Sequence, residues 1–126
     1  ETSGISAPIV LSLEAFSCRG TCPVFHFTID KKGVAHYTGS RYTERLGDFS
    51  YRLKQAELDA FWAVFETNSW DEIEGNALGR YQDIQRFELQ FKGKVIAFNR
   101  RAASKELLFI LEALEEKMTE LHWAPD

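Results

Sequence analysis

Residues 24–38 alternate apolar and polar side chains on both sides of a short turn. A period of two is typical of a strand with one buried face, and Gly33 can adopt the positive φ that closes a three-residue turn. A register with Phe27 across from Tyr37 brings the apolar side chains of both strands to the same side. The pattern therefore predicts a β-hairpin with one apolar face.

A second segment, residues 86–99, alternates in the same way around the two-residue turn Lys92-Gly93. Pairing Leu89 with Ile96 again gathers the apolar side chains on one face, which supports this register. The alternation therefore predicts a second hairpin. Two further strands are expected over residues 9–16 and 48–53.

Two other segments change the apolar period from two to three or four residues, which indicates amphipathic helices. The first helix is expected over Gln55–Thr67 and the second over residues 105–122, with Ser104 as the N-cap of the second. The apolar stripes consist of Leu58, Phe61, Trp62 and Phe65 in the first helix, and of Leu107, Leu111, Leu114, Met118 and Leu121 in the second.

The expected order of elements is β-β-β-β-α-β-β-α, and the fold class is α+β. Hairpin connections favour a mostly antiparallel sheet, and both amphipathic helices are expected to pack on its single apolar face. The opposite face of the sheet would then be polar and open to water. The 126 residues are expected to form a single globular domain over residues 1–126, with residues 1–8 as a flexible N-terminal segment.

The chain is weakly acidic, with a formal net charge of −4 and a pI of about 5.4. General binding to nucleic acid or to an anionic membrane needs a basic face, so no nucleic-acid partner is expected. No apolar run approaches the roughly 18 residues that span a bilayer, so no membrane span is expected either. The sequence leaves the oligomeric state open.

Both cysteines lie in the hexapeptide Cys18-Arg19-Gly20-Thr21-Cys22-Pro23, between two expected strands. A structural zinc site needs four ligands, of which this pair supplies two. A thioredoxin-like redox site separates its cysteines by two residues at the start of a helix, unlike this pair. A Cys18–Cys22 disulfide that closes a tight connection fits the flanking strands better, and two reduced thiols are the alternative. A disulfide would favour an oxidising compartment.

The hexapeptide and the residues Val24-Phe25 that follow it resemble the Cys-x-Gly-x-Cys-Pro domain. This is a family of small bacterial domains of unknown function, often found in lipoproteins and other envelope proteins. The resemblance extends loosely over most of the chain, although Lys54 stands where a Ser-like helix cap would be usual. It implies a periplasmic or extracellular location, with a leader removed or not cloned, and it transfers no catalytic residues.

No catalytic residues, metal ligands or cofactor are expected. The chain contains no Gly-x-Ser-x-Gly, Walker, His-Glu-x-x-His or Rossmann glycine motif. In the expected hairpin, His26 and His36 share one face near Asp30, an arrangement that could bind a divalent metal. Solvent-facing polar residues on an open sheet are the simpler interpretation, because metal affinity needs a rigid preformed shell.

The connection from Ser69 to Tyr81 has no clear period, and long loops in compact domains are often functional. It places carboxylates between aromatic residues, a combination that protein interfaces use as anchor and rim. The alternative is that Trp70, Ile73 and Leu78 pack the loop onto the core. The partner-binding candidates are Trp70, Asp71, Glu72, Glu74, Tyr81 and Asp83.

The sequence thus predicts a non-enzymatic envelope or secreted domain that binds another protein. Its acidic balance favours a basic partner, and one form of the hypothesis is an inhibitor or immunity-type protein. Two alternatives stay open. The first is a small redox or hydrolytic enzyme that uses Cys18, Cys22 or the histidines, and the second is a structural accessory domain of an envelope assembly.

Overall fold

A computed structural model describes residues 7–81 and 83–126 of the chain. The strands are β1 (Ile9–Ala15), β2 (Val24–Asp30), β3 (Val34–Arg41), β4 (Gly47–Arg52), β5 (Arg86–Phe91), β6 (Lys94–Asn99) and β7 (Ala124–Pro125). The helices are α1 (Gln55–Thr67), α2 (Lys105–Glu120) and the single 3-10 turn η1 (Trp70–Glu72). The flexible segment expected over residues 1–8 falls mostly on residues 1–6, which lie outside the described residues.

The strands form one antiparallel sheet in the order β6-β5-β1-β2-β3-β4-β7. Both predicted hairpin registers are confirmed, since Phe27 lies across from Tyr37 and Leu89 across from Ile96. The turn between β2 and β3 closes with Gly33 at a φ of 85°. The sheet gains one strand that the sequence does not predict, the two-residue β7 beside β4.

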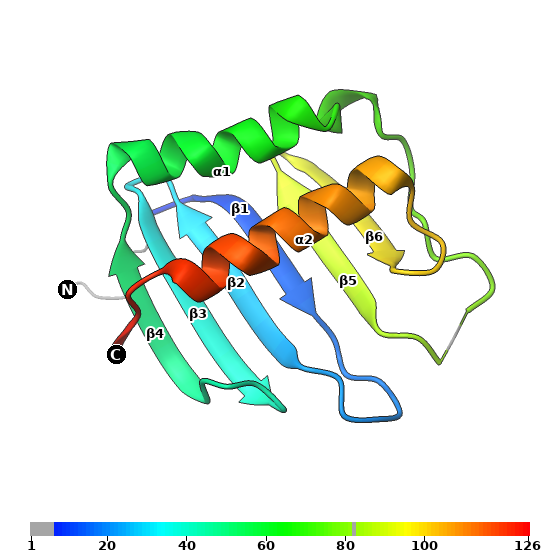
Figure 1. Ribbon diagram of the computed structural model, residues 1–126, viewed down its shortest axis with the longest axis horizontal. Coiled ribbons are helices and arrows are strands. Elements are labelled where there is room, and N and C mark those ends of the chain that lie inside the picture. The colour runs from blue at the N-terminus through cyan, green and yellow to red at the C-terminus, as the bar shows by residue number, and fades with distance from the viewer. Residues whose placement is uncertain (1–6, 82) are drawn as a thin grey trace.

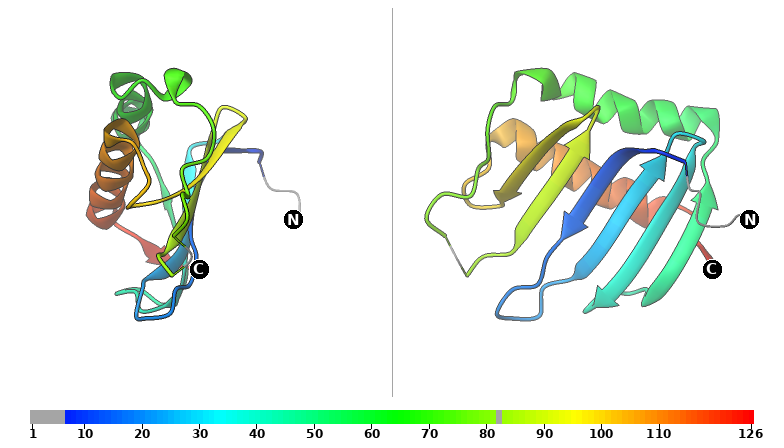
Figure 2. Two further views of the ribbon diagram at one scale, coloured as in Figure 1. Left: turned by 90° about the vertical axis from the view of Figure 1, so that its right-hand side faces the viewer. Right: turned by 180° about the vertical axis from the view of Figure 1, so that it is seen from behind.

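Both helices pack on the same face of the sheet, as the apolar pattern predicts (Figures 1 and 2). The N-terminal end of α2 is fixed by Ser104, whose Oγ accepts a hydrogen bond from the backbone N–H of Leu107 (3.2 Å). At the other end α2 stops at Glu120, two residues earlier than expected, because the chain turns there toward β7. The fold is therefore the predicted α+β arrangement of one sheet and one helical layer.

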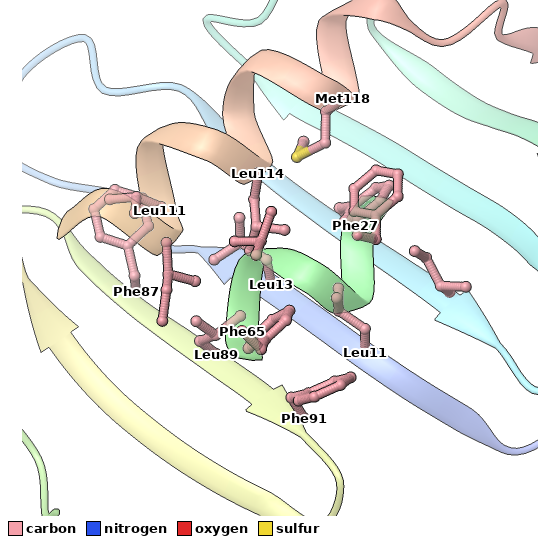
Figure 3. Close-up of a cluster of buried hydrophobic side chains, with 14 of the residues drawn as sticks. Leu11, Leu13, Phe27, Phe65, Phe87, Leu89, Phe91, Leu111, Leu114 and Met118 are labelled. Atoms are coloured by element: carbon pink, nitrogen blue, oxygen red, sulfur yellow. The ribbon is translucent and has the colours of Figure 1, made fainter. Parts of the chain in front are cut away.

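The core fills the space between the two layers. Figure 3 shows strand residues such as Leu13 and Leu89 clustered with Phe65 of α1 and with the α2 residues Leu111 and Leu114. All five side chains are almost completely buried. Seen from behind in Figure 2, the other face of the sheet is covered by none of the described helices. That face displays mostly polar side chains, as expected: Ser12, Glu14, His26, Thr28, His36, Thr38, Ser50, Arg86, Glu88 and Gln90.

Candidate functional site

Trp70, the central aromatic residue of the candidate binding loop, is a core residue. Its side chain is 2% exposed, and its indole N–H donates to the carbonyl oxygen of Phe91 (3.3 Å). The ring of Phe65 meets the indole edge to face, with the ring centroids 5.3 Å apart. The ammonium of Lys94 lies 5.0 Å from the indole centroid on the strand side. Trp70 therefore ties the loop to the core and contributes nothing to its exposed surface.

The middle of the same loop covers the outer edge of β6. Ala77 forms a parallel bridge with Phe98, in which the N–H of Ala77 donates to the carbonyl oxygen of Ala97 (2.9 Å). The side-chain amide of buried Asn99 donates to the carbonyl oxygen of Leu78 (2.7 Å). Unpaired backbone groups on a strand edge invite association with other chains, so this pairing protects the sheet.

The other candidate residues of the loop separate into two places. Glu72 and Glu74 are exposed and line a hollow of about 340 Å³, together with Glu106 from the first turn of α2. We call this the acidic hollow; its remaining lining residues are Ser69, Ile73 and Ser104. Asp71 is exposed in the same turn, η1.

Tyr81 and Asp83 lie apart from the acidic hollow, and each contacts an arginine. The guanidinium of Arg101 lies 5.0 Å from the ring centroid of Tyr81, which is 44% exposed. A carboxylate oxygen of Asp83 lies 3.2 Å from Nε of Arg19 in the cysteine loop. The structure thus brings Glu72 and Glu74 together with Glu106 of α2. Asp71 instead lines a separate hollow beside Lys92, and Tyr81 and Asp83 lie apart from both.

Charge is distributed unevenly between the helical layer and the rest of the chain. The two helices and residues 70–74 hold eleven of the nineteen carboxylates but only two of the fifteen lysines and arginines. The remaining residues are therefore net positive, although the whole chain is negative. We call the carboxylates of the helices and of residues 70–74 the acidic helical surface; all are exposed except Glu57 and Glu115, which are half-buried. Its members are Glu57, Asp59, Glu66, Asp71, Glu72, Glu74, Glu106, Glu112, Glu115, Glu116 and Glu120.

A groove with an aromatic floor opens at the other end of the helical layer. Figure 1 shows the surrounding elements, with the C-terminal end of α2 above β2 and β3 and the β3–β4 connection at the lower end of the sheet. The groove has a volume of about 220 Å³, and we call it the aromatic groove. Its lining consists of Pro23, Phe25, Tyr37, Tyr42, Thr43, Glu44, Arg45, Glu115, Met118, Thr119 and Trp123.

The rings of the aromatic groove contact one another at different angles. Tyr37 stacks on Phe25 with centroids 5.7 Å apart, and it meets Trp123 at 5.6 Å with an interplanar angle of 40°. The indole N–H of Trp123 donates to the carbonyl oxygen of Met118 (2.9 Å), which fixes the indole against α2. Apolar walls with a few polar groups at the rim are typical of binding pockets.

Burial raises the pKa of the Tyr37 phenol above its ordinary value of 10, although a hydrogen bond with Thr43 and the charge of Arg45 oppose this shift. The phenol is therefore protonated at neutral pH.

The outer wall of the groove is the β3–β4 connection, residues 42–46. It lies so close to Gly39 of β3 that a Cβ there would overlap the carbonyl oxygen of Arg45 and lie 2.6 Å from the hydroxyl of Thr43. In the same connection, Tyr42 holds a positive φ of 57° and is 56% exposed. A tyrosine in this left-handed conformation is uncommon and is often found at a binding site. Gly39 is thus the residue that lets the wall approach the sheet.

The two cysteines form a disulfide in the described structure, with a Cα–Cα distance of 5.9 Å. The disulfide loop adjoins the aromatic groove through Pro23. The side-chain amide of Gln85 donates to the carbonyl oxygens of Phe16 (2.8 Å) and Pro23 (2.6 Å), on either side of the loop. The disulfide and Gln85 together fix the connection between β1 and β2.

The histidines of the open sheet face have separate partners. His26 Nε2 lies 2.8 Å from the hydroxyl of Ser12, and His36 Nε2 lies 3.1 Å from a carboxylate oxygen of Asp30. Burial raises the pKa of Asp30, but hydrogen bonds from the N–H groups of Val34 and Lys32 and from His36 outweigh it, so the pKa is lowered overall. No group of three or more His, Cys, Asp or Glu side chains that could hold a metal ion occurs within residues 7–81 and 83–126.

Sequence reasoning missed the aromatic groove, because its residues come from β2, β3, the β3–β4 connection and the end of α2. One available signal was Gly39, since a glycine inside a strand often marks a close approach of another backbone.

The described helices include none that is long and apolar enough to cross a membrane.

Among the comparisons with known proteins, the comparison with protein families gives a match. A search of curated proteins and a search of solved structures each gave no match. A family match covers residues 9–122, from the start of β1 to just beyond the end of α2. The chain therefore belongs to the family described as Domain of unknown function (DUF6438).

Proposed function

We propose that this domain is a non-enzymatic protein-binding module whose acidic helical surface recognises a basic partner protein. The observation that carries the proposal is the charge segregation, with eleven carboxylates against two basic residues in the helical layer and residues 70–74. Like charges held on one face repel each other and create a field that attracts an oppositely charged partner. An inhibitor or immunity-type protein directed at a basic enzyme is one form of such a module.

The pairing of these carboxylates supports the proposal. Among the described residues, Glu115 is the one member of the acidic helical surface in a salt bridge, with Arg100 at 2.8 Å. The other carboxylates have no basic partner within the described chain, so an incoming lysine or arginine does not have to break an existing ion pair. A new pair across the interface then offsets part of the cost of removing these charges from water.

An exposed aromatic residue lies inside the acidic helical surface. Phe109 of α2 is 49% exposed, and Glu106 and Glu112 flank it at a spacing of three residues on the same side of the helix. Interfaces concentrate their binding energy in a few aromatic anchors surrounded by polar residues. Phe109 with its two neighbouring carboxylates fits that arrangement for a basic partner.

The test is capture of partner proteins by the immobilised domain from an envelope extract of the source organism. Two triple variants are compared. The first reverses the acidic hollow by Glu72→Lys, Glu74→Lys and Glu106→Lys, and its matched control reverses three carboxylates of the sheet by Glu14→Lys, Asp48→Lys and Glu88→Lys. Thermal unfolding first checks that both variants are folded.

We expect a basic protein to bind the wild type and the sheet variant but not the hollow variant. The purified partner should then associate more slowly as the salt concentration rises, because screening weakens the attraction. Capture of the same proteins by all three versions, or binding that does not respond to salt, would contradict the proposal.

We also propose that the domain works in the periplasm or outside the cell of a bacterium. The Cys18–Cys22 disulfide supports this, because disulfides persist in oxidising compartments and are rare in the cytosol. The resemblance of residues 18–25 to envelope domains supports it as well. A free-thiol assay on protein isolated from its native source, with alkylation during lysis, should find no free thiol. Two free thiols would argue for a cytosolic location.

A further inference from the structure

We infer that the aromatic groove takes up a single aromatic side chain from the partner, carried on a segment with lysine or arginine beside that side chain. The inference rests on the proposed function, because it names the part of a basic partner that the domain would hold. It adds a second contact point, at the opposite end of α2 from the acidic hollow.

The size of the groove selects the occupant. Pockets for cofactors and drug-sized ligands usually measure about 300–1,000 Å³, whereas the aromatic groove measures about 220 Å³. A dry cavity of about 150 Å³ already holds a benzene molecule. The space therefore suits one aromatic side chain and not an extended small molecule.

The chemistry of the floor selects an aromatic ring. Phe25, Tyr37 and Trp123 present ring faces at different angles around the same space. An inserted ring can stack on one of them, which is one of the geometries that aromatic pairs prefer, and contact the next ring at a tilt. Met118 completes the apolar wall with a flexible side chain that adapts to the shape of its contacts.

The charges around the groove select the flanking residues and their orientation. On the side of α2, Glu116 is exposed beside the lining residues Glu115 and Thr119, and it belongs to the acidic helical surface. Glu120 faces a separate hollow between the helices, with Glu57 and Lys117. On the opposite wall, Arg45 is the one cation among the described lining residues, next to Glu44. A basic flank therefore fits along α2, away from Arg45, and continues onto the surface proposed above.

The experiment uses three short peptides as probes with the full domain: Ac-Lys-Phe-Lys-NH2, Ac-Lys-Ala-Lys-NH2 and Ac-Glu-Phe-Glu-NH2. Two-dimensional NMR follows the indole N–H signal of Trp123, which reports directly on the floor of the groove. The same titrations are repeated with Thr119→Trp, which fills the groove from its exposed rim. Thr67→Trp, the same exchange at the exposed end of α1, is the matched control.

We expect Ac-Lys-Phe-Lys-NH2 to shift the Trp123 signal in a saturable way, with at least about tenfold higher affinity than the alanine peptide, because the phenyl ring is removed from water. The glutamate-flanked peptide should bind several-fold more weakly at low salt. Thr119→Trp should abolish the response, and Thr67→Trp should retain it.

The outcomes separate this inference from the proposed function. Equal binding of the phenylalanine and alanine peptides would overturn the groove as an anchor site, while attraction of basic peptides by the acidic helical surface would still stand. Equal binding of the lysine-flanked and glutamate-flanked peptides would overturn the basic flank and count against the proposed function as well. No shift of the Trp123 signal with any peptide at millimolar concentration would overturn the inference completely.

Discussion

Two connections of this molecule differ in how they use their side chains. Residues 68–85 pack mainly onto the core and the sheet edge, whereas residues 42–46 form the wall of a groove. The longer one is rich in the residues that interfaces use, yet its tryptophan is buried and its middle pairs with the edge of β6. The shorter one looks like an ordinary polar turn, yet it folds over Gly39 and forms the wall of the aromatic groove with Tyr42 56% exposed.

The contrast follows from where unpaired backbone and apolar surface remain after the sheet has formed. The edge of β6 needs cover, and a long connection that passes beside it can supply hydrogen bonds as well as a buried indole. At the lower end of the sheet, α2 ends at Glu120 and leaves the half-buried ring of Tyr37 at the aromatic groove. Length and composition alone therefore do not indicate which connection is free to bind a partner.

Trp70→Ala should lower the free energy of unfolding more than any other substitution considered below. Comparison with Tyr81→Ala shows which part of the long connection stabilises the fold and which part is simply exposed. We expect a loss of about 3–5 kcal/mol in the free energy of unfolding, as for other buried tryptophans. Tyr81→Ala, in the same connection but 44% exposed, should change it by no more than about 0.5 kcal/mol. Denaturant titration measures both. Equal losses, or a negligible loss for Trp70→Ala, would contradict the described burial.

Gly39→Ala tests the short connection in the same way. The added methyl group overlaps a backbone atom of the wall, so we expect the free energy of unfolding to fall by about 3 kcal/mol, the upper end of the usual range for overpacking. Gly20→Ala is the control, because its Cβ would have Cys18 Sγ as its nearest contact, at 4.0 Å. We expect little change for the control. NMR signals of Trp123 should move in Gly39→Ala only; unchanged signals would show that the wall does not depend on Gly39.

Most of the fold could be predicted from the sequence because its patterns leave few choices. In the first hairpin a shift of one residue would turn Phe27 and Ile29 toward water, so the register is determined by the apolar positions. The stripe of α2 in the same way leaves only one face that can pack on the sheet. In contrast, β7 contains two residues, Ala124 and Pro125, and no alternation can be read from so short a strand.

The candidate sites were less predictable because they depend on contacts between distant segments. Glu74 and Glu106 line one hollow although they are far apart in the sequence. Trp70 and Trp123 are both large aromatics near the end of an element, yet tertiary packing buries one completely and leaves the other at a groove. The sequence shows which residue types are present, but whether each one lies in the core or at the surface depends on how the elements pack.

Removing the disulfide should have a smaller effect and should act on the β1–β2 connection. This connection contacts Asp83 and Gln85 of the long connection, and it adjoins the aromatic groove through Pro23. The loop it closes is short, so the chain-entropy estimate for the double variant Cys18→Ser, Cys22→Ser is about 2 kcal/mol. Gln85 keeps the loop attached to β5 without the disulfide, and we expect the aromatic groove to persist. Denaturant titration with and without reducing agent gives the energy. Loss of the Trp123 signal pattern would show that the groove depends on the disulfide.

The ionisation of Tyr37 should have the smallest effect on the free energy of unfolding. Its pH dependence reports on how far the groove excludes water. Burial raises the folded-state pKa of its phenol above the ordinary value of 10, so above pH 10 the unfolded chain loses this proton first. The unfolded state then binds fewer protons than the native state, and stability falls as the pH rises through 10. We expect Tyr37→Phe to flatten this alkaline decline in denaturant titrations between pH 9 and 11.

Tyr51 is the necessary control, because a hydrogen bond to Glu57 and burial also raise its pKa. Tyr51→Phe should remove a separate part of the decline, and the double variant should remove both. If Tyr37→Phe left the slope unchanged while Tyr51→Phe reduced it, the phenol of Tyr37 would be as open to water as an ordinary surface tyrosine. The short connection would then exclude water from the groove less than the described contacts imply. The contrast between the two connections would reduce to a buried Trp70 in the long one and an open groove beside the short one.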